Sequence, residues 1–151
     1  FHLPLHSPFT IFVREQKNPT FMKQFAFPKA EHLCLQREID ALFVPGVHSA
    51  VAFPLRAVFL PVEWEGGPAV KVLLSVSKRK HKLAVDRNRA KRQIREAYRK
   101  NKHLLLASLL PGEGVHIGFL WLSDAPVASA VVERRMVGLL QRIAEKIAQS
   151  R

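Results

Sequence analysis

The hydrophobic residues of this chain form four short strand-like runs separated by turn and helix signals. Segments rich in Val, Leu, Ala and Phe predict strands at 49–53, 55–63, 69–77 and 114–123. The stretch Glu65-Gly66-Gly67-Pro68 is a strong turn signal. We therefore expect the second and third strands to pair as a hairpin.

Helical spacing of apolar residues occurs before, between and after these strands. In the first helix, which we expect within 28–43 and closed by Pro45-Gly46, the apolar positions are Leu33, Leu35, Ile39, Leu42 and Phe43. The last helix carries one stripe of Val132, Met136, Leu139, Leu140, Ile143 and Ile147. The resulting order is α-β-β-β-α-β-α, which predicts an α+β sandwich with helices packed on one four-stranded sheet.

The chain length of 151 residues suits one compact domain, which we assign to residues 29–151. Residues 1–28 contain four prolines and six phenylalanines without a helical or strand period. We expect this segment to be disordered or extended. Met22 offers an alternative start of the natural chain, in which case residues 1–21 are an upstream extension.

Charge changes this picture, because half of the 24 Lys and Arg residues lie in one segment. Residues 77–102, SKRKHKLAVDRNRAKRQIREAYRKNK, hold twelve basic residues and only two acids. This segment therefore supplies +10 of the net charge of +12. A local excess of this size repels itself unless an anionic partner is present, so it points to nucleic acid or an acidic membrane surface.

The rest of the composition narrows the chemistry. The single cysteine, Cys34, excludes an intrachain disulfide and a cysteine-based zinc site, and we expect it to be a small buried hydrophobe in a cytoplasmic protein. No apolar run reaches the roughly 18 residues needed to span a membrane. The seven histidines and twelve acids show no catalytic or metal-binding spacing, so we expect no catalytic residue and no metal site in the protein itself.

The basic segment predicts a helix with two distinct sides, beginning at Arg87 after Asp86 as its N-cap. Ala90, Ile94, Ala97 and Tyr98 share one arc that can pack on the sheet. On the neighbouring arc the cations recur every four residues without interleaved acids, at Arg87, Lys91, Arg95 and Arg99. Like charges at this spacing are unfavourable, so phosphates that neutralise them explain the row better than a solvated surface does.

Several functions remain open at this point. Arginine binds phosphate through a planar fork and stacks on bases, which favours nucleic acid over lipid. A general RNA-binding or ribosomal protein would fit, whereas a DNA-binding regulator lacks the helix-turn-helix partner helix, since a strand precedes the basic helix. An anionic-membrane binder would need more apolar area than the opposite arc offers.

The residues around this helix resemble a known signature. Ser75-Val76-Ser77-Lys78, followed by Ala84-Val85-Asp86-Arg87-Asn88-Arg89-Ala90-Lys91-Arg92 and Ile94-Arg95-Glu96-Ala97-Tyr98-Arg99, are similar to the "RNR" region of the bacterial ribonuclease P protein subunit. The likeness extends from about Met22 to Ile147, because the element order matches as well. It implies a fold like the second domain of ribosomal protein S5, with a left-handed β-α-β crossover that departs from the usual right-handed rule.

The resemblance also implies a function, that of the non-catalytic subunit of an endoribonuclease. In such a complex, a catalytic RNA with bound Mg²⁺ removes the 5′ leader of precursor tRNA. Mg²⁺ is then held mainly by that RNA and the substrate, with one protein per RNA and no membrane. The positions that the resemblance assigns to RNA binding are Lys78, Arg79, Arg87, Asn88, Arg89, Lys91, Arg92, Arg95 and Arg99. It assigns Ile39 and Phe43 to a cleft for the leader, where Phe43 can stack on a base and Ile39 cannot, with core packing as the alternative role of Phe43. We add Phe53 and Arg56 to this cleft from their position on the early strands.

Overall fold

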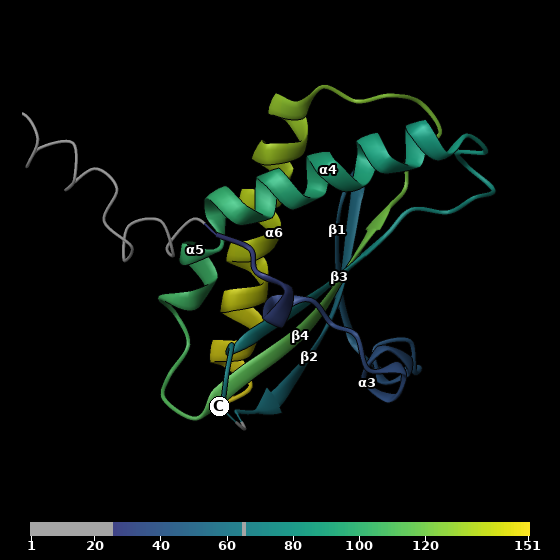
Figure 1. Cartoon of the computed structure of the whole chain (residues 1–151). Helices are drawn as coiled ribbons and strands as arrows, with labels where there is room; N and C mark the ends of the chain where they lie inside the picture. Colours follow the sequence, from purple (N-terminus) through teal and green to yellow (C-terminus); the bar gives the residue numbers. More distant parts are fainter. Residues whose placement is uncertain (1–25, 65) are drawn as a thin grey trace, which may run out of the picture.

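The computed structural model describes residues 26–64 and 66–151, so the expectations for residues 1–25 lie outside it. The described part of the chain is an α+β fold with a four-stranded mixed sheet and four α-helices (Figure 1). The strands are β1 (His48–Ala52), β2 (Leu55–Glu63), β3 (Val70–Ser75) and β4 (Glu113–Trp121). The helices are α3 (Gln36–Ala41), α4 (Ala84–Asn101), α5 (His103–Leu106) and α6 (Ser129–Gln149), and a 3-10 turn, η1, spans Lys29–Glu31.

The strand order is β1-β2-β4-β3, which contradicts the predicted hairpin between β2 and β3. β4 lies between them, antiparallel to β2 over nine residue pairs and parallel to β3. The hairpin of this sheet instead joins β1 to β2 through Phe53-Pro54, where the peptide bond is cis. The glycine-rich turn signal was correct about the change of direction, but it contained no information about which strand would become the neighbour.

Helices α4 and α6 cover one face of the sheet, and α3 lies on the other face (Figure 1). The buried residues of α4 and α6 are those predicted from the helical spacing: Ala90, Ile94, Ala97 and Tyr98 in α4, and Val132, Met136, Leu139, Leu140, Ile143 and Ile147 in α6. They pack on Leu55, Phe59, Ile117 and Phe119 of the sheet. On the opposite face a smaller core forms where Leu33 and Leu42 meet Val58.

The first helix is much shorter than predicted. After the turn at Lys29–Glu31 the chain is extended, and α3 covers only the six residues Gln36–Ala41. The amide of Leu33 donates to the carbonyl of Val72 at 2.9 Å, so this segment runs beside the free edge of β3. Pairing with a strand edge satisfies backbone groups that a helix would satisfy internally, which helical spacing cannot reveal. Cys34 is exposed in consequence, and its predicted burial is wrong.

The basic helix α4 begins at Ala84, earlier than predicted. Leu83 is its N-cap, with no side-chain cap hydrogen bond, so the N-cap assignment of Asp86 is wrong. Asp86 lies in the first turn, where a carboxylate still favours the positive end of the helix dipole. Because β3 and β4 are parallel neighbours joined through α4, the fold contains the expected β-α-β unit, and its left hand stays a prediction. Within the described residues, every helix is too short or too polar to span a membrane.

Candidate nucleic-acid interface

Helix α4 presents its cations to solvent because its opposite side is anchored in the core. Ala90, Ile94, Ala97 and Tyr98 are at most 3% exposed and fix the rotation of the helix. The adjoining side then faces outward, with Asn88, Arg89, Arg92 and Arg95 exposed and Lys91 partly exposed. Lys78 and Arg79 are also exposed in the loop before the helix. The structure thus places the predicted RNA-binding residues on one end and one side of α4.

Most of this surface is free of acidic partners. Among residues 26–64 and 66–151, no ion pair involves Lys78, Arg79, Arg89, Lys91, Arg92 or Arg95. We call the four cations of the helix in this set, Arg89, Lys91, Arg92 and Arg95, the open row. Because these four cations form no ion pair with an acid of the described residues, the open row is available to an external polyanion.

Arg99 is a different case, because an acid of the same helix neutralises it. Its Nε and Nη2 donate to the two carboxylate oxygens of Glu96 at 2.8 and 3.0 Å. This hydrogen bond lowers the pKa of Glu96, against a smaller opposing effect of burial. The row without acids that we expected from the sequence therefore ends before Arg99.

Arg87 also differs from the open row, since its guanidinium is used inside the protein. Its Nη1 donates to the backbone carbonyls of His81 and Lys82, at 2.9 and 2.8 Å. These contacts tie the end of the basic loop to the first turns of α4. Arg87 thus shapes the loop that carries Lys78 and Arg79, besides contributing its charge.

The same loop is fastened on its other side to the segment that follows β4. Lys80 Nζ donates to the carbonyl of Leu122 at 2.6 Å and lies 3.9 Å from the carboxylate of Asp124. The ring of His81 lies 2.9 Å from the carbonyl oxygen of Ser123, which can only accept, so Nε2 carries the proton. These partners are 42 residues apart in the chain, and no spacing in the sequence indicates them.

Gln93 makes a third link of this kind, which the sequence interpretation missed. Its amide nitrogen donates to the carbonyl of Val127 at 2.7 Å and to the hydroxyl of Ser129 at 3.1 Å. The amide orientation follows from these partners, because the carbonyl can bond only to the nitrogen. Gln93 therefore joins α4 to the start of α6.

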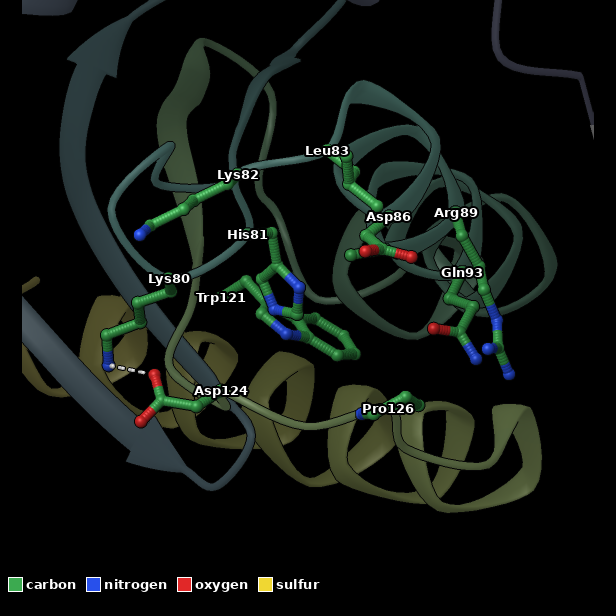
Figure 2. A pocket seen from close by; sticks show the side chains of 11 residues that line it. Lys80, His81, Lys82, Leu83, Asp86, Arg89, Gln93, Trp121, Asp124 and Pro126 are labelled. Carbon is green, nitrogen blue, oxygen red and sulfur yellow. Dashed lines mark ion pairs between the residues drawn. The ribbon is translucent and has the colours of Figure 1, made fainter.

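These links enclose a pocket of about 240 Å³ at the N-terminal end of α4 (Figure 2). Its walls come from the basic loop, the first turns of α4 and the segment after β4. The lining residues are Lys80, His81, Lys82, Leu83, Asp86, Arg89, Ala90, Gln93, Trp121, Asp124 and Pro126. One member of the RNR triplet, Arg89, thus borders a pocket as well as belonging to the open row.

The predicted cleft residues lie on the sheet face that carries α3. Arg56 is exposed there, because its neighbours Leu55 and Ala57 point into the core under α4 and α6. Phe43 is 50% exposed, and its ring lies over Gly118 of β4, where an added Cβ would be 3.9 Å from the ring atom Cζ. The structure therefore brings Phe43 and Arg56 to the same face.

The other two cleft residues differ in exposure. Phe53 is 60% exposed in the turn between β1 and β2. Ile39 is partly buried and packs against the small core of Leu33, Leu42 and Val58. Phe53 can thus meet a ligand with much of its ring, whereas Ile39 mainly supports α3. In the part of the chain that the structure describes, no group of three His, Cys, Asp or Glu side chains could hold a metal ion.

Comparisons with known proteins find relatives of this chain in one family. The family described as Ribonuclease P matches residues 27–143 of the chain. The ribonuclease P protein component of Porphyromonas gingivalis is 38% identical over 128 residues, which cover 83% of this chain and 92% of that protein. The one from Chlorobaculum tepidum is 36% identical over 107 residues, covering 66% of this chain and 70% of that protein.

Solved structures show the same fold at lower identity. The RNase P protein from Thermotoga maritima superposes with a TM-score of 0.58 at 23% identity, over 74% of this chain and 96% of that one. The RNase P protein of Staphylococcus aureus gives a TM-score of 0.59 at 17% identity, over 76% and 96%.

Proposed function

Because the chain belongs to the ribonuclease P protein family, we propose that it is the RNA-binding subunit of a tRNA-processing ribonucleoprotein. In this role it binds a catalytic RNA and the 5′ leader of precursor tRNA, and it assists Mg²⁺-dependent removal of that leader. The observation that carries the proposal is the open row on α4, whose cations form no ion pair within the described residues. A folded RNA supplies the missing negative charge.

In this proposal, two surfaces of the protein bind different RNAs. The open row and the basic loop contact phosphates of the catalytic RNA, with Asn88 as an uncharged donor to a base edge or a 2′-hydroxyl. The face with Phe43, Phe53 and Arg56 receives the single-stranded leader, whose bases stack on aromatic rings. One protein per RNA can then hold the leader beside the catalytic RNA.

The protein contributes charge and position in this mechanism, and the chemistry stays with the RNA. Cations that neutralise crowded phosphates reduce the repulsion between the catalytic RNA and its substrate. Mg²⁺ is bound mainly by the RNA and the substrate, where it can activate water and stabilise the leaving oxygen. The protein therefore lowers the Mg²⁺ concentration that the complex needs. We expect it to act in the cytoplasm, where precursor tRNA is made.

Reconstitution tests this proposal directly. The protein is mixed with a bacterial ribonuclease P RNA and a 5′-extended tRNA, and the cleavage rate is measured across a Mg²⁺ series. We expect a large stimulation at limiting Mg²⁺ and a smaller one when Mg²⁺ is abundant. The same rate with and without the protein at every Mg²⁺ concentration would reject the proposed function. Equal binding of precursor and mature tRNA would instead favour a general RNA-binding protein.

A further inference from the structure

The pocket at the N-terminal end of α4 presents chemistry that phosphate binding does not use. A phosphate has only acceptor oxygens to offer, so a phosphate site needs donors and positive charge. This pocket is lined by cations, but also by the carboxylate of Asp86 and the amide of Gln93 (Figure 2). A ligand that suits it must offer hydrogen-bond donors as well as acceptors.

The orientation of Gln93 defines one of these acceptors. Its amide nitrogen is engaged by Val127 and Ser129, which leaves the amide oxygen as the group facing the pocket. Asp86, on the first turn of α4, points its carboxylate toward the same space. Arg89 lies beside Gln93, one turn earlier on the helix, and supplies a donor fork. Two acceptors and one guanidinium thus border a single cavity.

The remaining walls suit a flat apolar body. Leu83, Ala90, Trp121 and Pro126 line the pocket between its polar groups. Its volume of about 240 Å³ is below the roughly 300–1,000 Å³ of pockets for drug-sized ligands, so it is suited to one base and not to a whole nucleotide. The bonds from Arg87, Lys80 and Gln93 hold the walls in place without a ligand, which lowers the ordering cost of binding.

We propose that this pocket takes one unstacked guanine base of the bound RNA. Guanine is the standard base that combines two adjacent donors on its pairing edge with two acceptors on its other edge. Its donors match the carboxylate of Asp86 and the amide oxygen of Gln93, and its O6 and N7 match the guanidinium of Arg89. RNA-binding proteins commonly read unstacked bases in this way. The inference rests on the proposed function, and the base can come from the catalytic RNA or from precursor tRNA.

Inosine tests the proposal without changing the protein, because it lacks the exocyclic amino group of guanosine. The unmodified protein is titrated with GMP and with IMP, and NMR follows the side-chain amide of Gln93 and the indole N–H of Trp121. We expect both signals to shift, with GMP bound at least about fivefold more tightly than IMP. Equal affinities for GMP and IMP, or the same shifts with inorganic phosphate alone, would overturn the proposal.

The variant Asp86→Asn gives a second test, in which two explanations predict opposite signs. It removes a negative charge beside the open row, so a purely electrostatic role of the helix predicts tighter RNA binding. Loss of a base contact predicts binding that is weaker by roughly fivefold or more, and a GMP-to-IMP preference near one. The charge-matched control is Glu133→Gln, since Glu133 lies 3.9 Å from Lys100 of the same helix but outside the pocket.

Two arms separate the sources of the base. Affinity of Asp86→Asn is measured for the catalytic RNA and, separately, for precursor tRNA bound to the assembled complex. The arm that weakens identifies the RNA that supplies the guanine, and tighter or unchanged binding in both arms would refute the pocket's role. Stimulated cleavage by the unmodified protein together with equal GMP and IMP affinities would remove this inference while leaving the proposed function intact.

Discussion

The guanidinium of Arg87 donates a hydrogen bond of 2.9 Å to the backbone carbonyl of His81, six residues earlier in the chain. The same nitrogen bonds to the carbonyl of Lys82 at 2.8 Å. His81 is in turn bound through its ring to the carbonyl of Ser123. Arg87, the first residue of the Arg87-Asn88-Arg89 triplet, therefore holds the basic loop in place. Arg89 and Arg92 remain available to a partner.

This division of roles predicts different responses to lysine at two positions. Arg87→Lys keeps the charge but replaces the rigid guanidinium, whose Nη1 donates to both carbonyls, with an ammonium on a flexible stem. We therefore expect weaker RNA binding with an unchanged salt dependence. Arg92→Lys is the matched control, and its exposed side chain should lose little affinity. Filter binding at several salt concentrations measures both. Equal losses in the two variants would contradict the positioning role of Arg87.

The open row predicts a change in the salt dependence of RNA binding. In the double variant Arg92→Ala/Arg95→Ala two exposed cations that we assign to phosphates are lost, so the slope of log K against log salt should fall in magnitude by about 1.4 to 1.8. Arg134→Ala/Arg135→Ala removes the same charge from exposed positions of α6 and should change the slope much less. If both double variants give the slope of the unmodified protein, α4 is not the RNA-binding helix.

Because the ring of Phe43 is exposed, we expect that its removal weakens binding of the 5′ leader and leaves other RNA contacts unchanged. Phe43→Leu keeps an apolar side chain over Gly118 of β4 but removes the aromatic stacking surface, and each stacked base contributes about 1–3 kcal/mol. Affinity of the assembled complex for precursor tRNA should fall roughly 5- to 150-fold, with mature tRNA unaffected. Trp64→Leu is the control, because Trp64 is also 50% exposed but follows directly after the last residue of β2, Glu63. A Phe43→Leu complex that still prefers precursor tRNA as strongly would assign this ring to packing.

The buried ion pair between Lys102 and Glu31 predicts a large effect on stability. Lys102 Nζ lies 2.9 Å from Glu31 Oε1 and also donates to the carbonyl of Ala26. Glu31→Gln leaves a buried ammonium without its counter-charge and should lower the free energy of unfolding by roughly 3 kcal/mol. Adding Lys102→Met should recover most of this loss.

Thermal or urea unfolding measures these changes. The exposed pair of Lys100 and Glu133 is the control, and Glu133→Gln should cost less than about 1 kcal/mol. A loss in Glu31→Gln no larger than in this control would mean that solvent reaches the ammonium of Lys102 in solution.

The contact of Glu113 with Arg151 predicts that the free energy of unfolding decreases at low pH. The hydrogen bond from Arg151, supported by the backbone N–H of Leu110, lowers the pKa of Glu113 from 4.5 to about 2. Because the pKa of this carboxyl is lower in the folded than in the unfolded state, the contact stabilises the fold fully when the pH is above about 4.5, the unfolded value. The contribution is lost as the pH falls through about 2, the folded value. The stability difference between the unmodified protein and Glu113→Gln should therefore shrink between pH 5 and pH 2. A difference that stays constant over this window would show that the carboxyl is not coupled to folding.

Much of this protein can be predicted from local sequence. Helical periodicity identified every buried residue of α4 and α6, because a helix that packs on a sheet must bury one stripe. The charge count of residues 77–102 indicated a polyanion partner, and the open row confirms that most of this charge is unpaired within the described residues. Both features arise from residues within a few turns of one another.

The arrangement of distant segments was decided only by the tertiary structure. The place of β4 between β2 and β3, the pairing of Leu33 with Val72, and the bonds from Lys80 and His81 to the segment after β4 all join residues that are about 40 or more positions apart. Such contacts depend on which backbone edges and carbonyls remain unsatisfied after the sheet has formed. Periodicity describes one element at a time. It could therefore place the charge on a helix, but it could not predict the pocket at the N-terminal end of α4, whose walls come from three separate segments.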